Sequence, residues 1–243
     1  MTTLTKFIVG LIISLTLLSC NFDIQNGGWG VRGNGDVESV ERDISDDFDE
    51  IKVSRGLDVY LTQGDVVSLE VQADENLHDI IMTEVENNVL RIYADENISY
   101  SSSRKVFVSF KDVSKITASS GSDVYSTNTI KANDLELTTT SGSDMELDVD
   151  VNNLDCTSTS GSDLRISGNA NKLFAEATSG SDIKAGNLKA KICEARATSG
   201  ADITVHTSDE LYAKATSGGD IKYHGNPEKV TKKDGVSGSI RKQ

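Results

Sequence analysis

The stretch "SGSDVYSTNTIKANDLELTTTSGSDMELDVDVNNLDCTSTSGSD", residues 120–163, contains the tetrapeptide Ser-Gly-Ser-Asp three times. Related copies continue as far as Gly218, and the successive glycines are separated by 21, 19, 19, 20 and 18 residues. A degenerate copy at Ser237 has lost the aspartate. A regular period of this length predicts a solenoid, in which each repeat buries its apolar side only by stacking on its neighbours.

The residues between the glycines alternate between apolar or small and polar. Leu135, Leu137 and Thr139 share one side of the chain before Gly142, and the residues between them are polar. The alternation resumes after the turn with Met145. A period of two is typical of half-buried strands. We therefore predict an all-β fold, a parallel β-helix (β-solenoid) with coils of about 20 residues, each built as strand, glycine turn, strand and connection.

The recurring turn residues have a structural explanation. Glycine adopts the positive φ of a sharp corner, and short Ser and Asp side chains accept hydrogen bonds from turn amides. In stacked coils the aspartates would form a column with neighbours about 5 Å apart. Hydrogen bonding to the turns is the favoured explanation; a cation shared along the column, with Ca²⁺ as the candidate, is the second, although an aspartate-only ladder supplies few ligands per ion. The column comprises Asp123, Asp144, Asp163, Asp182, Asp202 and Asp220. No other metal or cofactor site is predicted.

The N-terminus has the features of an export signal. Phe7 to Leu18 is an apolar run too short to span a bilayer, which predicts a signal peptide over residues 1–19. The sequence "LLSC" at 17–20 resembles a bacterial lipobox, which implies cleavage before Cys20 and lipidation of that cysteine; ordinary secretion is the alternative. The predicted order is then a Gly-rich and acidic tether (20–47), the solenoid (48–236) and a basic C-terminal tail (237–243).

Two cysteines remain after Cys20. Cys156 and Cys193 occupy inward positions two coils apart, or roughly 9.6 Å by the strand spacing, whereas a disulfide requires Cα atoms within about 7 Å. We expect both to be free thiols that act as small buried apolar residues.

The first half of the chain has less regular strands. Residues 81–86 and 89–93 flank Asn87-Asn88, which predicts a β-hairpin with a tight turn. "GLDVY" at 56–60 matches "GSDVY" at 121–125, so the same corner occurs before the repeats begin. We expect irregular coils of the same solenoid with an inserted hairpin.

The stretches "FDEIKVSRGLDVYLTQGD", "NNVLRIYAD" and "VFVSFKDVSKITASSGSDV", together with the repeats, resemble a family of secreted proteins common in Bacteroidetes, the auto-transporter adhesins with a head GIN domain. The resemblance spans about residues 48–236. The family's namesake tripeptide is present as Gly56-Leu57-Asp58, which differs at two positions. The resemblance implies a right-handed parallel β-helix on a secreted or lipid-anchored protein, and it brings no catalytic or ligand residues.

Four classes of function compete. A binding or adhesion scaffold without catalysis, with a glycan or a surface protein as partner, fits the long ladders of Ser, Thr and Asp. The alternatives are a polysaccharide-active enzyme, a periplasmic structural lipoprotein and an ice- or mineral-binding array; no charged cluster departs from the repeat as a catalytic site would. The net charge of −14 argues against a nucleic-acid partner. We expect a cell-envelope protein, an outer-membrane lipoprotein held by its lipid and facing either the periplasm or the outside.

Overall fold

The computed structural model describes residues 30–243, and those from Val31 onward form one compact unit. The predicted signal peptide and Cys20 lie outside the described residues. Within the described part, no helix is long and apolar enough to cross a membrane. Secondary structure is almost entirely strand, with one short 3₁₀ turn, η1 (Glu75–Leu77).

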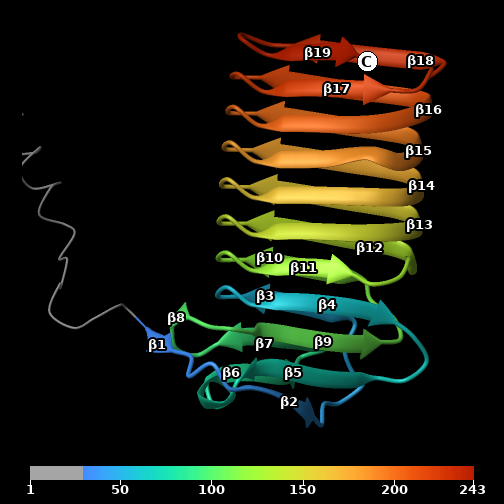
Figure 1. Ribbon diagram of the computed structural model, residues 1–243. Coiled ribbons are helices and arrows are strands. Elements are labelled where there is room, and N and C mark those ends of the chain that lie inside the picture. Colours follow the sequence, from blue (N-terminus) through green and yellow to red (C-terminus); the bar gives the residue numbers. More distant parts are fainter. Residues whose placement is uncertain (1–29) are drawn as a thin grey trace, which may run out of the picture. The chain divides into compact units, whose positions relative to one another are not determined.

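The regular part of the fold is a stack of coils in which one repeat lies directly on the next (Figure 1). Every pairing between these strands is parallel and nearly in register, so Leu135, Leu154 and Leu173 form one buried column. This confirms the predicted parallel β-solenoid. Its strands are β10 (Lys115–Ser119), β11 (Asp123–Ser126), β12 (Ile130–Thr140), β13 (Asp144–Thr159), β14 (Asp163–Thr178), β15 (Asp182–Thr198), β16 (Asp202–Thr216), β17 (Asp220–His224), β18 (Lys229–Asp234) and β19 (Ser239–Lys242).

One detail of the predicted repeat is wrong. In β13 to β16, a single long strand runs from the aspartate to the threonine two residues before the next glycine, with no separate connection. In β13 the inward alternation continues to Val151, breaks at Asn152 and Asn153, and resumes at Leu154. The strand therefore bends while its backbone hydrogen bonds to the neighbouring coils continue. Two outward residues in a row mark this bend.

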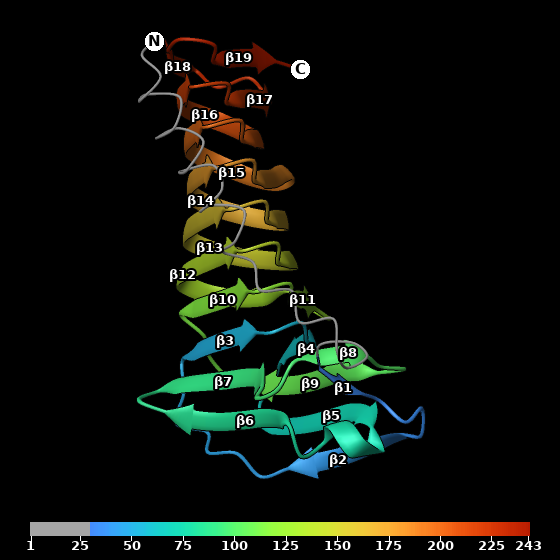
Figure 2. The same cartoon turned by 90° about the vertical axis from the view of Figure 1, so that its left-hand side faces the viewer.

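The N-terminal part combines parallel and antiparallel strands (Figure 2). The strands β3 and β4 pair in parallel with β10 and β11, which confirms that the coils begin before the repeats. The predicted hairpin is confirmed as β6 and β7, with positive φ at Asn87 and Asn88. The strands are β1 (Val31–Arg32), β2 (Val37–Arg42), β3 (Glu50–Ser54), β4 (Asp58–Gln63), β5 (Ser68–Asp74), β6 (Ile81–Glu86), β7 (Val89–Ala94), β8 (Ile98–Tyr100) and β9 (Arg104–Phe110).

The folded unit extends beyond both predicted boundaries. Residues 31–42, expected to belong to the tether, form β1 and β2, which pair with β8 and β5. The segment 237–243, expected to be a tail, contributes β19, which pairs with β17 and buries Ile240. Both segments add hydrogen-bonded strands to otherwise open sheet edges, so backbone pairing outweighs their polar composition.

A buried carboxylate holds the N-terminal segment in place. Asp74 is fully buried, and it accepts hydrogen bonds from the amides of Gly35 (3.0 Å), Ser102 (2.9 Å) and Ser103 (2.9 Å). A Cβ at Gly33 would lie 2.0 Å from Asp74 Oδ2, so only glycine fits beside the carboxylate. This contact joins the entry segment to the loop between β8 and β9.

Candidate functional site

The predicted aspartate column is present and in register. Each aspartate is paired by backbone position with the aspartate of the next coil, from Asp123 to Asp220, and the order is Asp123, Asp144, Asp163, Asp182, Asp202 and Asp220. The column also includes Asp58, whose backbone partner is Asp123. The tripeptide Gly56-Leu57-Asp58 therefore forms the same corner as the repeats, with Leu57 fully buried and Gly56 at φ 76°.

The turn amides, however, bond mainly to other residues, and of these aspartates only Asp123 receives a backbone hydrogen bond, from Asp144. The preceding residue of the repeat, a fully buried serine, accepts the turn hydrogen bond instead: Ser143 Oγ accepts from Thr140 N at 3.1 Å. Ser162 and Ser181 do the same for Thr159 and Thr178. The glycine amides donate to the serine carbonyl of the next coil. At these turns the serine, and not the predicted aspartate, is the acceptor, so the serine and glycine shape the scaffold.

A second feature of the turn was also unexpected. The serine before each glycine has positive φ as well, between 52° and 59° in the six intact repeats. Two consecutive residues in this conformation make the tightest hairpin-like corner, and a short polar residue tolerates it better than a bulky one. The sequence signal for this geometry is the Ser-Gly pair rather than glycine alone.

The aspartate side chains face solvent and lie beside basic residues in the middle of the stack. Asp163 binds Arg165 at 2.8 Å and Lys184 at 3.0 Å, and Lys184 also reaches Asp182 at 3.2 Å. Arg241 lies 3.3 Å from Asp220 in the same way. The column is thus partly neutralised by basic residues that lie two positions after the aspartate in the same coil, or at the equivalent position in the next coil.

The N-terminal end of the column is different. Burial raises the pKa of Asp123, and the neighbouring carboxylates of Asp58 and Asp144 raise it further. Burial also raises the pKa of Asp58, against the opposing effect of Arg104 and Lys105. Among the described residues, no group of three or more His, Cys, Asp or Glu side chains is arranged to hold a metal ion.

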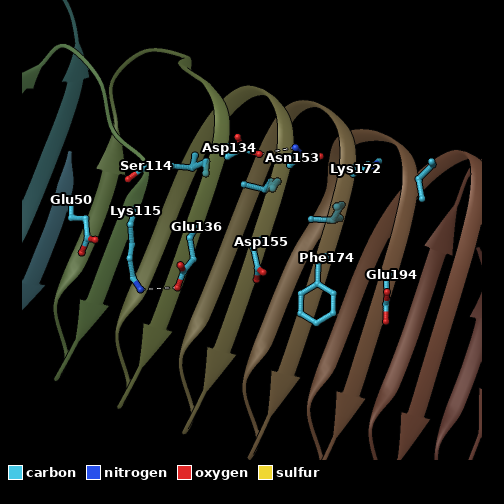
Figure 3. A pocket seen from close by; sticks show the side chains of 14 residues that line it. Glu50, Ser114, Lys115, Asp134, Glu136, Asn153, Asp155, Lys172, Phe174 and Glu194 are labelled. Carbon is cyan, nitrogen blue, oxygen red and sulfur yellow. Dashed lines mark hydrogen bonds and ion pairs between the residues drawn. The ribbon is translucent and has the colours of Figure 1, made fainter.

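A groove runs across several neighbouring coils on the side opposite the aspartate column, at the bend of the long strands (Figure 3). It encloses about 640 Å³ and runs along the stack across β3, β10, β12, β13, β14 and β15. Its floor is the column of Leu135, Leu154 and Leu173. Two outward columns form its walls: Asp134, Asn153, Lys172 and Ile192 on one side, and Glu50, Lys115, Glu136, Asp155, Phe174 and Glu194 on the other.

Carboxylates dominate the walls of the groove, with five of them against two lysines. Lys115 is paired with Glu136 at 2.8 Å, and this contact raises the pKa of Lys115. The next residue along the column, Asp155, has a raised pKa because it is partly buried and lies beside Glu136 and Glu176. Asp134 instead accepts a hydrogen bond from Asn153 at 2.6 Å. The groove is therefore an acidic surface whose carboxyl groups differ in pKa.

An apolar patch interrupts the acidic walls. Phe174 follows Asp155 in its column, and Ile192 follows Lys172 with 40% of its surface exposed. The guanidinium of Arg196 lies 5.3 Å from the centre of the Phe174 ring and also binds Glu194. An aromatic ring between charged neighbours offers a flat apolar surface next to hydrogen-bond acceptors.

The sequence carries a signal for this groove in one outward column of the repeats. The outward residue six positions before each repeat glycine is Lys115, Glu136, Asp155, Phe174, Glu194 or Tyr212. This column changes its chemistry from coil to coil, whereas the turn residues hardly change. Variation within a regular repeat indicates where a surface is free to serve a purpose other than folding.

Comparison with known proteins agrees with the architecture. A family model described as putative auto-transporter adhesin, head GIN domain, matches residues 47–227. The chain belongs to this family. Its family points to a protein of the cell envelope or exterior with a binding or adhesion role. Among curated proteins, none matches the sequence.

Solved structures share the fold. A crystal structure of a putative adhesin from Bacteroides fragilis has a TM-score of 0.80 at 21% identity, covering 88% of this chain and 100% of that chain. A putative lipid binding protein from Parabacteroides distasonis has a TM-score of 0.71 at 25% identity, with coverages of 88% and 99%. A putative adhesin from Parabacteroides merdae has a TM-score of 0.71 at 20% identity, with coverages of 88% and 98%.

Proposed function

We propose that this protein is a non-catalytic binding scaffold of the cell envelope, anchored through a lipid on Cys20, whose groove takes an extended polysaccharide. The observation that carries the proposal is the groove itself, which is open along the stack and presents equivalent positions from successive coils. A surface that repeats once per coil suits a ligand that is itself a repeating chain.

The chemistry of the walls favours a polymer rich in hydroxyl or amino groups. Ionised carboxylates accept hydrogen bonds from both, and such charge-assisted bonds are stronger than neutral ones. Phe174 and Ile192 can cover the apolar face of a sugar ring. The excess of carboxylates in the groove repels acidic polymers. Neutral and amine-bearing polysaccharides are therefore the preferred class.

One observation favours a second candidate, glycoside hydrolysis. Such enzymes use two nearby carboxyl groups, one with a raised pKa, and Asp155 has a raised pKa beside Glu136. We place binding first because both residues follow the regular register of the coils and lie in a broad, open groove. A catalytic pair needs a site that excludes water and fixes the substrate more closely.

The test compares binding with cleavage. Detergent-solubilised full-length protein is incubated with chitosan, cellulose and alginate, and both bound protein and released reducing ends are measured. We expect retention on chitosan and cellulose, weak retention on alginate and no release of reducing ends. Phe174→Ala should lower retention several-fold, while Thr204→Ala on the aspartate face serves as the matched control and should leave it unchanged. Equal retention of both variants would refute the groove as the binding surface. Release of reducing ends by wild-type protein that is lost in Asp155→Asn would establish the enzyme.

The anchor is tested separately. Full-length protein expressed in its own envelope should enter the detergent phase, and Cys20→Ser should move it to the aqueous phase. A variant that stays in the detergent phase would refute lipidation at Cys20.

A further inference from the structure

The described unit ends in unpaired sheet edges on both sides of the stack. At one end, β2 pairs only with β5, and β6 only with β7. At the other end, β18 pairs only with β16, and β19 only with β17. Figures 1 and 2 show β2 and β6 at one extremity of the coils and β18 and β19 at the other. Such edges leave backbone donors and acceptors available to another strand.

Exposed aliphatic side chains gather at these same edges. Val37 and Val40 of β2 are 44% and 39% exposed, and Val230 of β18 and Val236 before β19 are 41% and 88% exposed. These four are half of the eight large hydrophobic residues that are exposed in the described part of the chain. Each end therefore offers apolar surface together with its free backbone edge.

The two ends carry opposite charge. The N-terminal edges contain Glu38, Glu41, Glu84 and Glu86 against Arg42. The C-terminal edges contain Lys229, Lys232, Lys233, Arg241 and Lys242 against Asp234. Formal charges sum to −3 at one end and +4 at the other, counting only the residues of these four strands. Complementary potentials of this kind orient an encounter and select against contacts between like ends.

Strand direction makes the two ends compatible. β2 is antiparallel to β5, and β5 is antiparallel to β9. β9 pairs in parallel with β4 and β4 with β11, and all pairings from β11 along the coils to β19 are parallel as well. β2 and β19 therefore point the same way. A second copy shifted along the stack axis would place its β2 on β19 as a parallel pair, and its β6 on β18 as an antiparallel pair.

We propose that this protein associates head to tail with a second copy of itself, the basic edges of β18 and β19 meeting the acidic edges of β2 and β6. The contact joins two different surfaces, so it does not close on itself and extends into a row of stacked solenoids. Such rows would continue the outward columns of one copy into the next.

The edges also carry features that limit indiscriminate pairing. Arg42 donates hydrogen bonds to the carbonyls of Ile81 and His78 (2.7 Å to the latter), which occupies part of the backbone near β6. Lysines on β18 discourage pairing with a like-charged edge. Association is thereby made dependent on charge, which predicts that it weakens in salt.

The experiment uses a zero-length carbodiimide cross-linker on full-length protein in detergent, with ¹⁴N- and ¹⁵N-labelled populations mixed. Cross-links between Glu38 or Glu41 and Lys232, Lys233 or Lys242 can form only between molecules, because the whole stack separates these residues within one chain. We expect cross-links of this kind between the two labels. They should fall at least several-fold in 0.5 M salt, because the attraction between exposed charges then decays over about 4–5 Å.

Charge reversal decides the orientation. Lys232→Glu with Lys233→Glu, and separately Glu38→Lys with Glu41→Lys, should each lose the cross-links when used alone. Mixing the two variants should restore them between the reversed ends. Lys52→Glu with Lys131→Glu, on exposed positions within the stack, is the matched control and should behave as wild type. End-to-end cross-links that are absent in wild type, or that survive each reversal unchanged, would overturn the proposal.

Discussion

The regular coils and the N-terminal part of this molecule stack on one another but are stabilised differently. From Asp144 to the C-terminus the buried core contains ten alanines together with Cys156 and Cys193, whereas the described core before Asp144 contains only three alanines and includes Phe48 and Phe110. In the coils, the same serine hydrogen bond recurs at successive turns. In the N-terminal part, a single carboxylate, Asp74, joins three backbone amides.

The difference shows how a solenoid divides its stability. A thin core of small residues contributes little per coil, so the coils depend on in-register backbone pairing and on contact with their neighbours. Without the N-terminal strands, the first coil would have a neighbouring coil on one side only. The N-terminal strands cover that end with larger side chains and an individual polar contact, and they act as a cap.

The largest effect should come from removing the contact that is specific to the cap. Asp74→Ala leaves three amides without their acceptor in a buried site, and we expect it to cost about 4 kcal/mol of unfolding free energy. Denaturant unfolding followed by circular dichroism measures the loss. Asp65→Ala, at an exposed position in the same part, should change stability by less than about 0.5 kcal/mol.

Hydrogen exchange then locates the damage. If the coils depend mainly on their neighbours, Asp74→Ala should speed exchange in 31–35 and 101–103 far more than in β14 and β15. Uniformly faster exchange along the whole chain would show that cap and coils unfold as one unit, and the comparison between them would fail.

The next effect separates two glycines within one coil. Gly168 has φ 107°, and a Cβ there would lie 2.0 Å from the Val149 carbonyl oxygen, so Gly168→Ala should cost about 3 kcal/mol. Gly161 has φ 69°, and a Cβ there would meet nothing within 4 Å, so Gly161→Ala should cost about 1 kcal/mol from backbone strain alone. Thermal or denaturant melts of both variants provide the measurement, and equal losses would contradict this ranking.

Much of the regular fold was predictable because the repeat exposes its own periodicity. The alternation predicted the strands and the glycine spacing predicted the coils. The match of "GLDVY" to "GSDVY" predicted that coils begin before the repeats, and the structure shows that β4 pairs with β11. The extent of the fold was harder to predict. Val37 to Arg42 and Ser239 to Lys242 are polar and charged, and they are strands because a sheet edge is available to pair with them. Composition does not reveal a partner that is distant in sequence.

The candidate site was less predictable than the scaffold. The aspartate column was foreseen, but its hydrogen bonding was assigned to the wrong residue, since burial of the preceding serine depends on which way each side chain points at the corner. The groove depends on a bend at Asn152 and Asn153 that interrupts the alternation by one residue. A break in the alternation is read from sequence as a connection between two strands, so the concave surface beside the bend is not predicted.

An intermediate effect probes the thin core of the coils through pH. Burial raises the pKa of Cys193 to about 12 and that of Cys156 well above its ordinary value of 9.0. Above pH 9 the unfolded chain loses these thiol protons while the folded chain keeps them, so stability falls as pH rises, by about 1.4 kcal/mol per pH unit for each cysteine. At pH 10.5 this amounts to about 2 kcal/mol for Cys193.

Other groups titrate in the same range, so the informative quantity is a difference between proteins. The double variant Cys156→Ala and Cys193→Ala should show a shallower decline of unfolding free energy between pH 9 and 11 than wild type. Identical slopes would mean that the thiols ionise in the folded state and that the coils admit water, contrary to their burial.

The smallest effect distinguishes two aspartates that occupy the same position of the repeat. Asp163 lies in the middle of the column, 28% exposed and paired with Arg165 and Lys184, so Asp163→Asn should cost up to about 1 kcal/mol through lost surface ion pairs.

Asp123 lies where the column meets the cap, and its pKa is raised by burial and by Asp58 and Asp144. A carboxylate whose folded pKa is raised favours folding below its unfolded pKa, near 4, and loses that contribution as pH rises through the folded value. At pH 7 the ionised Asp123 is therefore unfavourable, and Asp123→Asn should raise stability by a few tenths of a kcal/mol while removing this pH dependence. Parallel denaturant titrations at pH 4 and pH 7 test both variants. Changes of the same sign at pH 7 would show that the column behaves uniformly, and that the junction between cap and coils has no electrostatic character of its own.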